Sequence, residues 1–266
     1  MTYDRSNYIN EPVSIETELK SLFKTKSNLI VFDIGACEGE ESIKYSRLFP
    51  NASIYSFEPL PENISLIRNN FRNYQVKNAH YYNKAVSSKN GVTDFFVSSG
   101  HPEHAAKSDW DYGNKSSSLL QPDKHLEVAS FIKFETRIKV ETITLKSFCT
   151  ENNIRSIDFL HMDVQGAELM VLEGAQDLIS AIKVIWLEVS KIEFYKQQPL
   201  VHDIQKFMKA NRFFLLKDAL NSIQGDQLYI SKLHYSRFAI LKIQTGVALK
   251  LFMGRIKKLV VNKSLK

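Results

Sequence analysis

Four residues between positions 33 and 58 have the types and the spacing of a site for a nucleotide-like cofactor. Asp33, Gly35 and Gly39 belong to the turn DIGACEG, which follows an apolar run expected to be a buried strand. Glycines in such a turn let the backbone approach a ligand closely. Glu58 ends the next expected strand, where an acid can accept hydrogen bonds from both hydroxyls of a ribose. The pattern predicts a site for an adenosine-containing cofactor.

The same turn distinguishes between classes of adenosine cofactor. A dinucleotide site has the pattern G-x-G-x-x-G and presents helix amides to a pyrophosphate. In this chain Asp33 stands at the first glycine position, where its carboxylate would repel phosphate and attract an amino group. The pattern D-x-G-x-x-x-G resembles the turn that binds S-adenosylmethionine in class I methyltransferases. The alternative is an ordinary strand–turn–helix corner in which the glycines serve packing alone.

A second cluster of polar residues lies more than a hundred residues later, around Asp163. This acid ends an apolar run, and open α/β sheets bind their ligands at the carboxyl ends of their strands. His161 alternates with Asp163 and should point to the same side of the strand, although it could equally be a hydrogen-bonded core residue. Glu188 ends the following strand and should neighbour Asp163. The candidate catalytic residues are therefore Asp163, His161 and Glu188.

The elements that must position these residues alternate between strands and helices. We expect strands at 29–32, 53–57, 80–86, 91–97, 137–143, 157–164, 183–189, 213–216 and 227–230, and helices at 61–71, 145–152, 166–180 and 201–211. Strands separated by helices imply a mostly parallel sheet with right-handed crossovers. The segment 98–130 lacks periodicity, and long insertions of this kind often form substrate sites. We place the acceptor pocket there, around His101, His104, Trp110, Asp111 and Tyr112.

Composition limits the class of protein. A chain of 266 residues with 44% hydrophobic content can bury one substantial core. The two cysteines have no metal-ligand companions at close spacing, the N-terminus is polar, and no run of eighteen apolar residues occurs. These features indicate a reducing compartment, and we expect a cytoplasmic protein.

The basic character of the chain resides in its C-terminal tail. Residues 231–266 contain nine Lys/Arg and no Asp or Glu, so the formal charge of +6 for the whole chain leaves residues 1–230 at −3. A body of this charge argues against nucleic acid as a partner. At helical spacing, one face of the tail collects the apolar residues Phe238, Leu241, Ala248, Leu249, Phe252, Ile256 and Leu259. Such a helix could lie on an anionic membrane or pack on the body.

Five ordered motifs together resemble the FkbM family of S-adenosylmethionine-dependent methyltransferases. The resemblance covers roughly residues 28–214 and rests on DIGACEG (33–39), FEPLPEN (57–63), NKAVS (83–87), Ser117-Ser118-Leu119 and HMDVQGAELMVLEGA (161–175). It implies a Rossmann-like class I methyltransferase fold with a mostly parallel seven-stranded sheet and helices on both faces. The expected domains are a helical lead-in (1–27), the methyltransferase domain (28–231) and the basic amphipathic tail (232–266).

The resemblance also implies residue roles. Asp33 would meet the methionine amine, Glu58 the ribose, and the backbone near Ala85 the adenine. The expected cofactor-binding residues are Asp33, Gly35, Ala36, Cys37, Gly39, Glu58, Pro59, Asn83, Ala85 and Asp163. The family commonly has Asn, Lys and Glu where this chain has Cys37, His161 and Gln165. The last two flank Asp163, so the substitutions bear on the catalytic details.

The expected reaction is O-methylation of a hydroxyl on a sugar, a glycan precursor or a small metabolite. Asp163 or His161 would accept the hydroxyl proton, with Glu188 as partner, and no metal is required. A route in which Asp163 and Glu188 hold a divalent cation is the less favoured alternative. A non-catalytic adenosine-binding module and an NAD-dependent sugar oxidoreductase are the rival functions. Peripheral membrane contact through the tail and self-association are left open.

Overall fold

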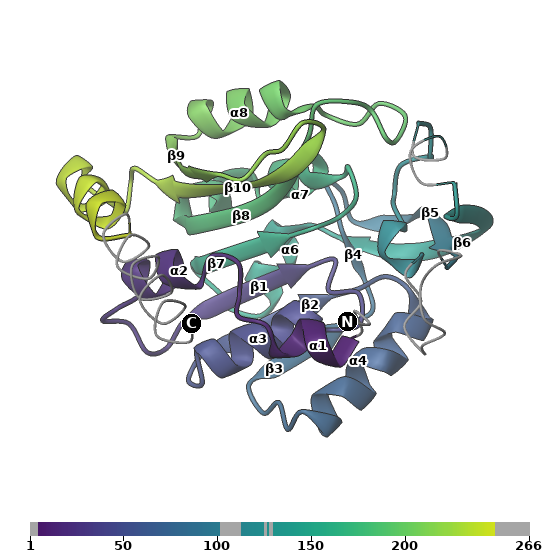
Figure 1. Cartoon of the computed structure of the whole chain (residues 1–266), viewed down its shortest axis with the longest axis horizontal. Coiled ribbons are helices and arrows are strands. Elements are labelled where there is room, and N and C mark those ends of the chain that lie inside the picture. The colour runs from purple at the N-terminus through teal and green to yellow at the C-terminus, as the bar shows by residue number, and fades with distance from the viewer. Residues whose placement is uncertain (1–4, 102–112, 125–126, 128–129, 248–266) are drawn as a thin grey trace, which may run out of the picture.

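The computed structural model describes residues 5–101, 113–124, 127 and 130–247. Its main layer is a seven-stranded sheet with the strand order β3-β2-β1-β7-β8-β10-β9 (Figure 1). All neighbouring pairs among the first five strands are parallel, and β10 runs antiparallel to β8 and β9. The strands are β1 (Ile30–Ile34), β2 (Ser53–Phe57), β3 (Ala79–Tyr82), β7 (Ile157–Met162), β8 (Ile182–Ser190), β9 (Phe213–Asp218) and β10 (Gln224–Ser231). The predicted mostly parallel seven-stranded sheet is confirmed.

A smaller sheet lies beyond the end of the large sheet toward which β1, β7 and β8 point (Figure 1). It has the order β4-β6-β5 and consists of β4 (Ala85–Val86), β5 (Gly91–Ser99) and β6 (Lys133–Ile143). The prediction of one strand over 80–86 is wrong, because the chain leaves the large sheet after Tyr82 and enters the small one at Ala85. Asn83 lies at the break, where its side-chain amide donates to the carbonyls of Glu58 and Pro59.

Helices cover both faces of the large sheet, as predicted. On one face Phe148, Leu172 and Met208 pack against residues of β1, β7 and β8, and on the other Leu19 and Tyr45 do so. The helices are α1 (Arg5–Asn10), α2 (Glu16–Leu22), α3 (Glu40–Leu48), α4 (Pro61–Asn73), α6 (Leu145–Glu151), α7 (Glu168–Gly174) and α8 (Val201–Ala210), with 3₁₀ turns η1 (Asn114–Ser116) and η2 (Gln176–Ala181). Among the described residues, no helix has the length and apolar character needed to cross a membrane.

The predicted helix over 166–180 is shorter and divided in the structure. Gln165 and Gly166 have φ values of 54° and 93°, so the chain turns there and α7 begins only at Glu168. Ala175 separates α7 from η2, whose first residue, Gln176, has a φ of 50°. The left-handed backbone at these positions is incompatible with a continuous α-helix. The turn at 165–166 keeps the residues after β7 at the sheet edge that carries Asp163.

Candidate functional site

The glycine turn after β1 brings the two predicted clusters into contact. The amides of Gly35 and Ala36 both donate to the carbonyl of Phe57, at 3.0 and 2.9 Å. Gly35 has a φ of +81°, and a Cβ built on it would lie 2.0 Å from the backbone oxygen of Asp163. Only glycine fits this backbone conformation and this spacing. The close approach places Asp163 beside the turn.

Glu58 is buried at the end of β2 and is bound by the same turn. Its two carboxylate oxygens accept the amides of Cys37, at 3.0 Å, and Leu60, at 2.8 Å. Burial raises the pKa of Glu58 to about 8, although the two amides favour its ionised form. Asn83, which is exposed, binds the backbone of Glu58 and Pro59. Asn83 therefore stabilises the backbone at Glu58.

Asp33 and His161 form a buried pair below the turn. One oxygen of Asp33 accepts Ser42 Oγ, and the other lies 2.8 Å from His161 Nδ1. Burial alone would lower the pKa of His161, but the hydrogen bond and the charge of Asp33 outweigh it and raise that pKa to about 9. His161 is therefore an imidazolium at neutral pH, which is a poor proton acceptor. This argues against the predicted role of His161 as the base.

The pair makes stability depend on pH. Because the pKa of His161 is about 9 in the folded protein and 6.5 without its partners, its contribution is fully present below pH 6.5 and is lost as the pH rises through 9. We expect His161→Asn to have a lower free energy of unfolding than wild type. This deficit should be about 3 kcal/mol larger at pH 6 than at pH 10. Denaturant titrations of both proteins at the two pH values measure this difference.

The matched control is His202→Asn. His202 lies 3.1 Å from Asp203 in an exposed pair, so the same substitution there should change stability by a few tenths of a kcal/mol at most. A His161→Asn deficit that is the same at pH 6 and pH 10 would contradict the assignment.

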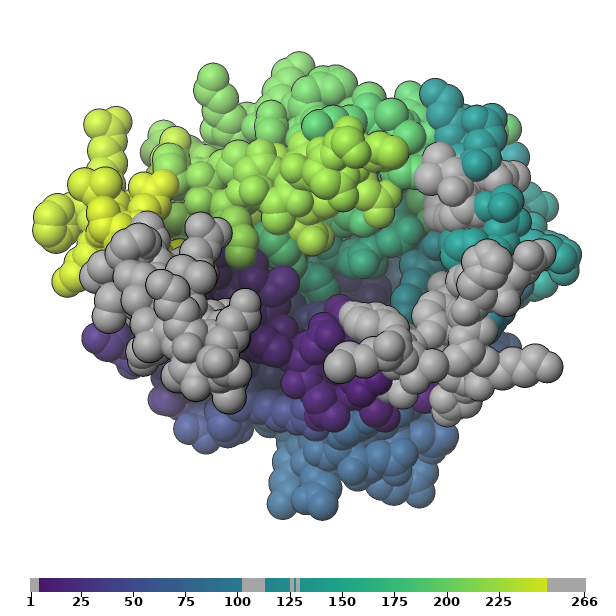
Figure 2. Space-filling view, viewed as in Figure 1, coloured from purple at the N-terminus to yellow at the C-terminus, as the bar shows by residue number. Residues whose placement is uncertain are grey.

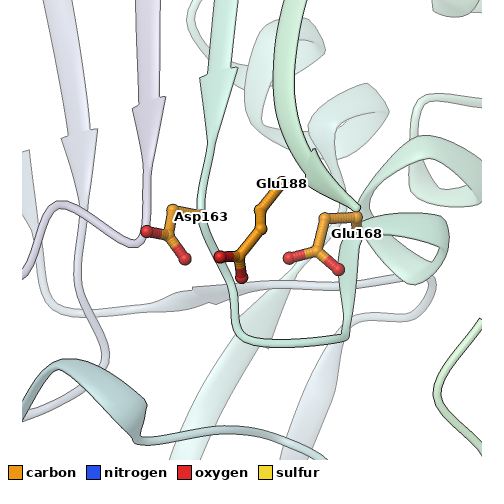
Figure 3. A group of neighbouring side chains, drawn as sticks. All are labelled: Asp163, Glu168 and Glu188. Carbon is orange, nitrogen blue, oxygen red and sulfur yellow. The ribbon is translucent and has the colours of Figure 1, made fainter. Parts of the chain in front are cut away.

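Three carboxylates lie together at the carboxyl ends of β7 and β8, as Figure 3 shows for Asp163, Glu168 and Glu188. One oxygen from each lies within 4.8 Å of the others. The predicted proximity of Asp163 and Glu188 is thus present, and the Gln165 amide bridges them, at 2.6 Å from Asp163 and 3.4 Å from Glu188. Glu168 Oε1 also accepts the amides of Val164 and Gly166.

Desolvation and the proximity of the carboxylates raise the pKa values in this cluster. Burial and then the charge of Asp163 raise the pKa of Glu188 well above its usual range. Desolvation by the surrounding protein also raises the pKa of Asp163, although its side chain is exposed to the cavities that it lines, and Gln165 and His161 oppose this effect. Glu168 would add a third oxygen to the divalent-cation alternative. Both amides are accepted by Oε1, which leaves Oε2 as a possible ligand, so the divalent-cation route stays an alternative to the metal-free one.

Three adjoining cavities meet at this cluster. The narrow cavity, about 50 Å³, is lined by Glu58, Pro59, Ala85, Phe95 and Leu119 among others. The acidic cavity, about 280 Å³, is lined by Tyr8, Asp33, Glu40, Glu41 and His161 among others. The wide cavity, about 670 Å³, is lined by Gln165, Glu188, Tyr195, Gln198 and Gln224 among others. Within the described part of the chain, Lys115 and Asp163 are the residues that line all three.

Lys115 was not identified from the sequence. It lies in η1, where its ammonium group is 2.6 Å from Glu40 Oε1 and 3.7 Å from Cys37 Sγ. The neighbouring Asn114 donates to Glu38 Oε1 at 3.0 Å. The only sequence signal was their position directly before the Ser117-Ser118-Leu119 motif. Lys115 and Glu40 are 75 positions apart, and no local sequence pattern predicts an ion pair over that separation.

The predicted acceptor pocket is only partly described. His104, Trp110, Asp111 and Tyr112 lie outside the described residues, and His101 is exposed and absent from the linings of the three cavities. The end of the insertion nevertheless takes part, because Lys115 and Ser116 line the wide cavity. The other walls come from the loop after β8 and the β9–β10 turn, which carried no chemical motif in the sequence.

Known proteins share these motifs and this arrangement. The family described as Methyltransferase FkbM domain matches residues 33–215. The 2-O-methyltransferase NoeI of Sinorhizobium fredii (strain NBRC 101917 / NGR234) is 31% identical over 223 residues, which cover 83% of this chain and 87% of that protein. The 31-O-demethyl-FK506 methyltransferase FkbM of Streptomyces tacrolimicus is 26% identical over 56% of this chain and 60% of its own length.

A solved structure of magnesium protoporphyrin IX methyltransferase (ChlM) from Synechocystis PCC 6803 with bound SAM is similar in fold, with a TM-score of 0.45 and 11% identity over 86% of this chain and 90% of that one. The family match extends over more than two thirds of the sequence and includes both the glycine turn and the Asp163 segment. The non-catalytic module and the NAD-dependent oxidoreductase are therefore set aside. The chain belongs to the FkbM family of methyltransferases, whose cofactor is S-adenosylmethionine.

Proposed function

We propose that this protein methylates a hydroxyl group of a sugar or a related polyhydroxylated small molecule. The observation that carries the proposal is the position of Asp163, which lines all three cavities. A carboxylate at this junction can contact both a cofactor and an acceptor. The relative NoeI, named a 2-O-methyltransferase, supports oxygen as the atom that is methylated.

The residues that line the narrow and acidic cavities suit the two halves of S-adenosylmethionine, and the narrow cavity, at about 50 Å³, would have to widen to admit the adenine. The narrow cavity offers apolar walls for a flat adenine and the carboxylate of Glu58 for a ribose. The acidic cavity contains both negative groups and the cations Lys115 and His161, a mixture that suits the ammonium and carboxylate of an amino acid. Gly35 adjoins both cavities, and the space a Cβ would need there is already taken by the Asp163 backbone.

The cofactor, when bound, supplies a methyl group already activated on a sulfonium. The protein's own task is to hold the acceptor oxygen in line with that group and to remove its proton. Asp163 would perform the second task, because it lies where the three cavities meet, and its raised pKa also favours uptake of a proton. Gln165 holds Asp163 Oδ1 at 2.6 Å and so orients the carboxylate.

The wide cavity supports a polyhydroxylated acceptor. Its lining is rich in side-chain amides, from Gln165, Gln198, Asn221 and Gln224, which can both donate to and accept from hydroxyl groups. Phe194 and Tyr195 add aromatic surface. Such a mixture of amides and rings orients neutral polar ligands. Glu188 lies at the border of this cavity, beside Asp163.

The test is an acceptor screen with purified protein and S-adenosylmethionine. Mono- and oligosaccharides would be compared with matched deoxy sugars, with amino sugars and with sugar acids, and products would be identified by mass spectrometry. We expect a methyl ether, which resists mild alkali, on a sugar with a free hydroxyl and none on the corresponding deoxy sugar. The Tyr195→Phe variant, which loses the hydroxyl bonded to Ser116 O at 2.7 Å, should raise KM for the acceptor more than KM for the cofactor.

Two results would contradict the proposal. An alkali-labile methyl ester would identify a carboxylate acceptor, and an N-methyl product would identify an amine. Either outcome would preserve the methyltransferase activity while excluding the hydroxyl as acceptor.

A further inference from the structure

A basic groove lies at the end of the sheet opposite the three cavities. It forms between the end of α8, the start of β9 and the helical residues 237–247, and its volume is about 740 Å³. Of the residues that the structure describes, four cations line it, Lys209, Arg212, Lys232 and Arg237, and no acid does. The remaining lining includes Phe214, Ile240 and Leu241. The groove therefore combines uncompensated positive charge with apolar surface.

The rim of this groove exposes apolar side chains. Among the described residues, the exposed large hydrophobic side chains are those of Val92, Ile223, Leu233, Phe238 and Leu241. Three of the five fall between positions 233 and 241, and Phe238 is 77% exposed. Ile240 instead is buried and packs on the body. The helix is thus fixed to the protein through Ile240, while Phe238 and Leu241, which the sequence places on one apolar face, are exposed.

The groove is remote from the chemistry. Strand β10 is antiparallel to β8, so Lys232, which follows it, lies near the amino ends of the parallel strands. Figure 1 shows the helix of residues 237–247 at the left edge, away from the arrowheads of β1, β7 and β8, and Figure 2 shows it on the outside of the molecule. Substitutions on the rim therefore leave the catalytic cluster unchanged.

The neighbouring charges at this end do not neutralise the groove. The buried carboxylate of Asp158, at the start of β7, already binds two lysines, Lys26 at 2.6 Å and Lys183 at 2.7 Å. Because two lysines pair with one carboxylate, this group of three residues has a net positive charge. By sequence, residues 248–266 add six more Lys/Arg and no acid.

We propose that the basic groove and its apolar rim (Leu233, Phe238 and Leu241) are a docking surface for an anionic phospholipid bilayer. Lys209, Arg212, Lys232 and Arg237 would bind lipid phosphates, and the three rim side chains would enter the boundary between headgroups and acyl chains. Charge complementarity and the exposed aliphatic and aromatic groups, side by side, select this partner. A nucleic-acid surface would use the cations but would have no use for exposed leucines.

The test is flotation of the full-length protein with vesicles of phosphatidylcholine alone and of phosphatidylcholine with phosphatidylglycerol. We expect binding only to the anionic vesicles and release by high salt. Phe238→Ser/Leu241→Ser and Lys232→Gln/Arg237→Gln should each lower the partition coefficient by about fivefold or more. S-adenosylmethionine binding by each variant, measured by calorimetry, should stay at the wild-type value and shows that the variant is folded.

Matched controls come from the exposed side chains elsewhere. Val92→Ser removes an apolar group that is 66% exposed, and Lys133→Gln removes a cation whose side chain is 65% exposed. Both should bind vesicles like wild type. The proposal is overturned if wild type does not float with anionic vesicles, if it floats equally with neutral ones, or if both double variants float like wild type. Binding of RNA that depends on Arg237 but not on Phe238, without flotation, would assign the groove to nucleic acid instead.

Discussion

Replacing Asp163 with Asn should slow methyl transfer by about 10²- to 10⁴-fold and leave S-adenosylmethionine affinity within a few-fold of wild type. The substitution keeps the size of the side chain and its place at the junction of the three cavities. It removes the only property the proposed role requires, the ability to accept a proton. Single-turnover rates with a methylated acceptor from the screen, together with calorimetric cofactor binding, measure the two effects separately.

The control for this variant is Asp177→Asn. Asp177 is an exposed acid, 75% accessible and paired with Lys146, far from the cavities. It should retain the wild-type rate. An Asp163→Asn enzyme with full activity would exclude Asp163 as the base, and a parallel loss of cofactor binding would assign it to the cofactor site alone.

Replacing Glu58 with Ala should weaken S-adenosylmethionine binding by about 10²- to 10³-fold, the effect of losing the two hydrogen bonds that its carboxyl group would make to a ribose. The same change leaves the amides of Cys37 and Leu60 without their acceptor, so the free protein should lose about 1–3 kcal/mol of stability. Calorimetric titration and denaturant unfolding measure the two losses.

Two further variants separate these effects. Glu58→Gln retains one oxygen acceptor and should be more stable than Glu58→Ala, while it still binds the cofactor weakly. Glu62→Ala removes an exposed acid in the first turn of α4 and should change neither quantity. Wild-type affinity in Glu58→Ala would show that this carboxylate does not serve the cofactor.

Local sequence was sufficient for most elements of the fold. Strand β2 was predicted with its observed limits, and most other elements within a few residues, because apolar runs and turn residues act over short distances. The errors at residue 83 and at residues 165–166 share one cause. Asn83 binds the backbone of Glu58 and Pro59, and the carbonyl of Gln165 accepts a hydrogen bond from Ser118 Oγ at 2.7 Å. Contacts between residues this far apart in the chain leave no periodic signal.

The sequence by itself determined the cofactor turn, the acid at the end of β2 and the proximity of Asp163 to Glu188, since parallel strands end at a common edge. Tertiary structure alone decided how these groups are paired. It joined His161 to Asp33, which turns a candidate base into a cation, and it placed Lys115 against Glu40 at the junction of the cavities. The protonation state of a group and the identity of its hydrogen-bond partners depend on burial and on charges that are distant in the sequence. Burial and these charge contacts exist only once the chain has folded.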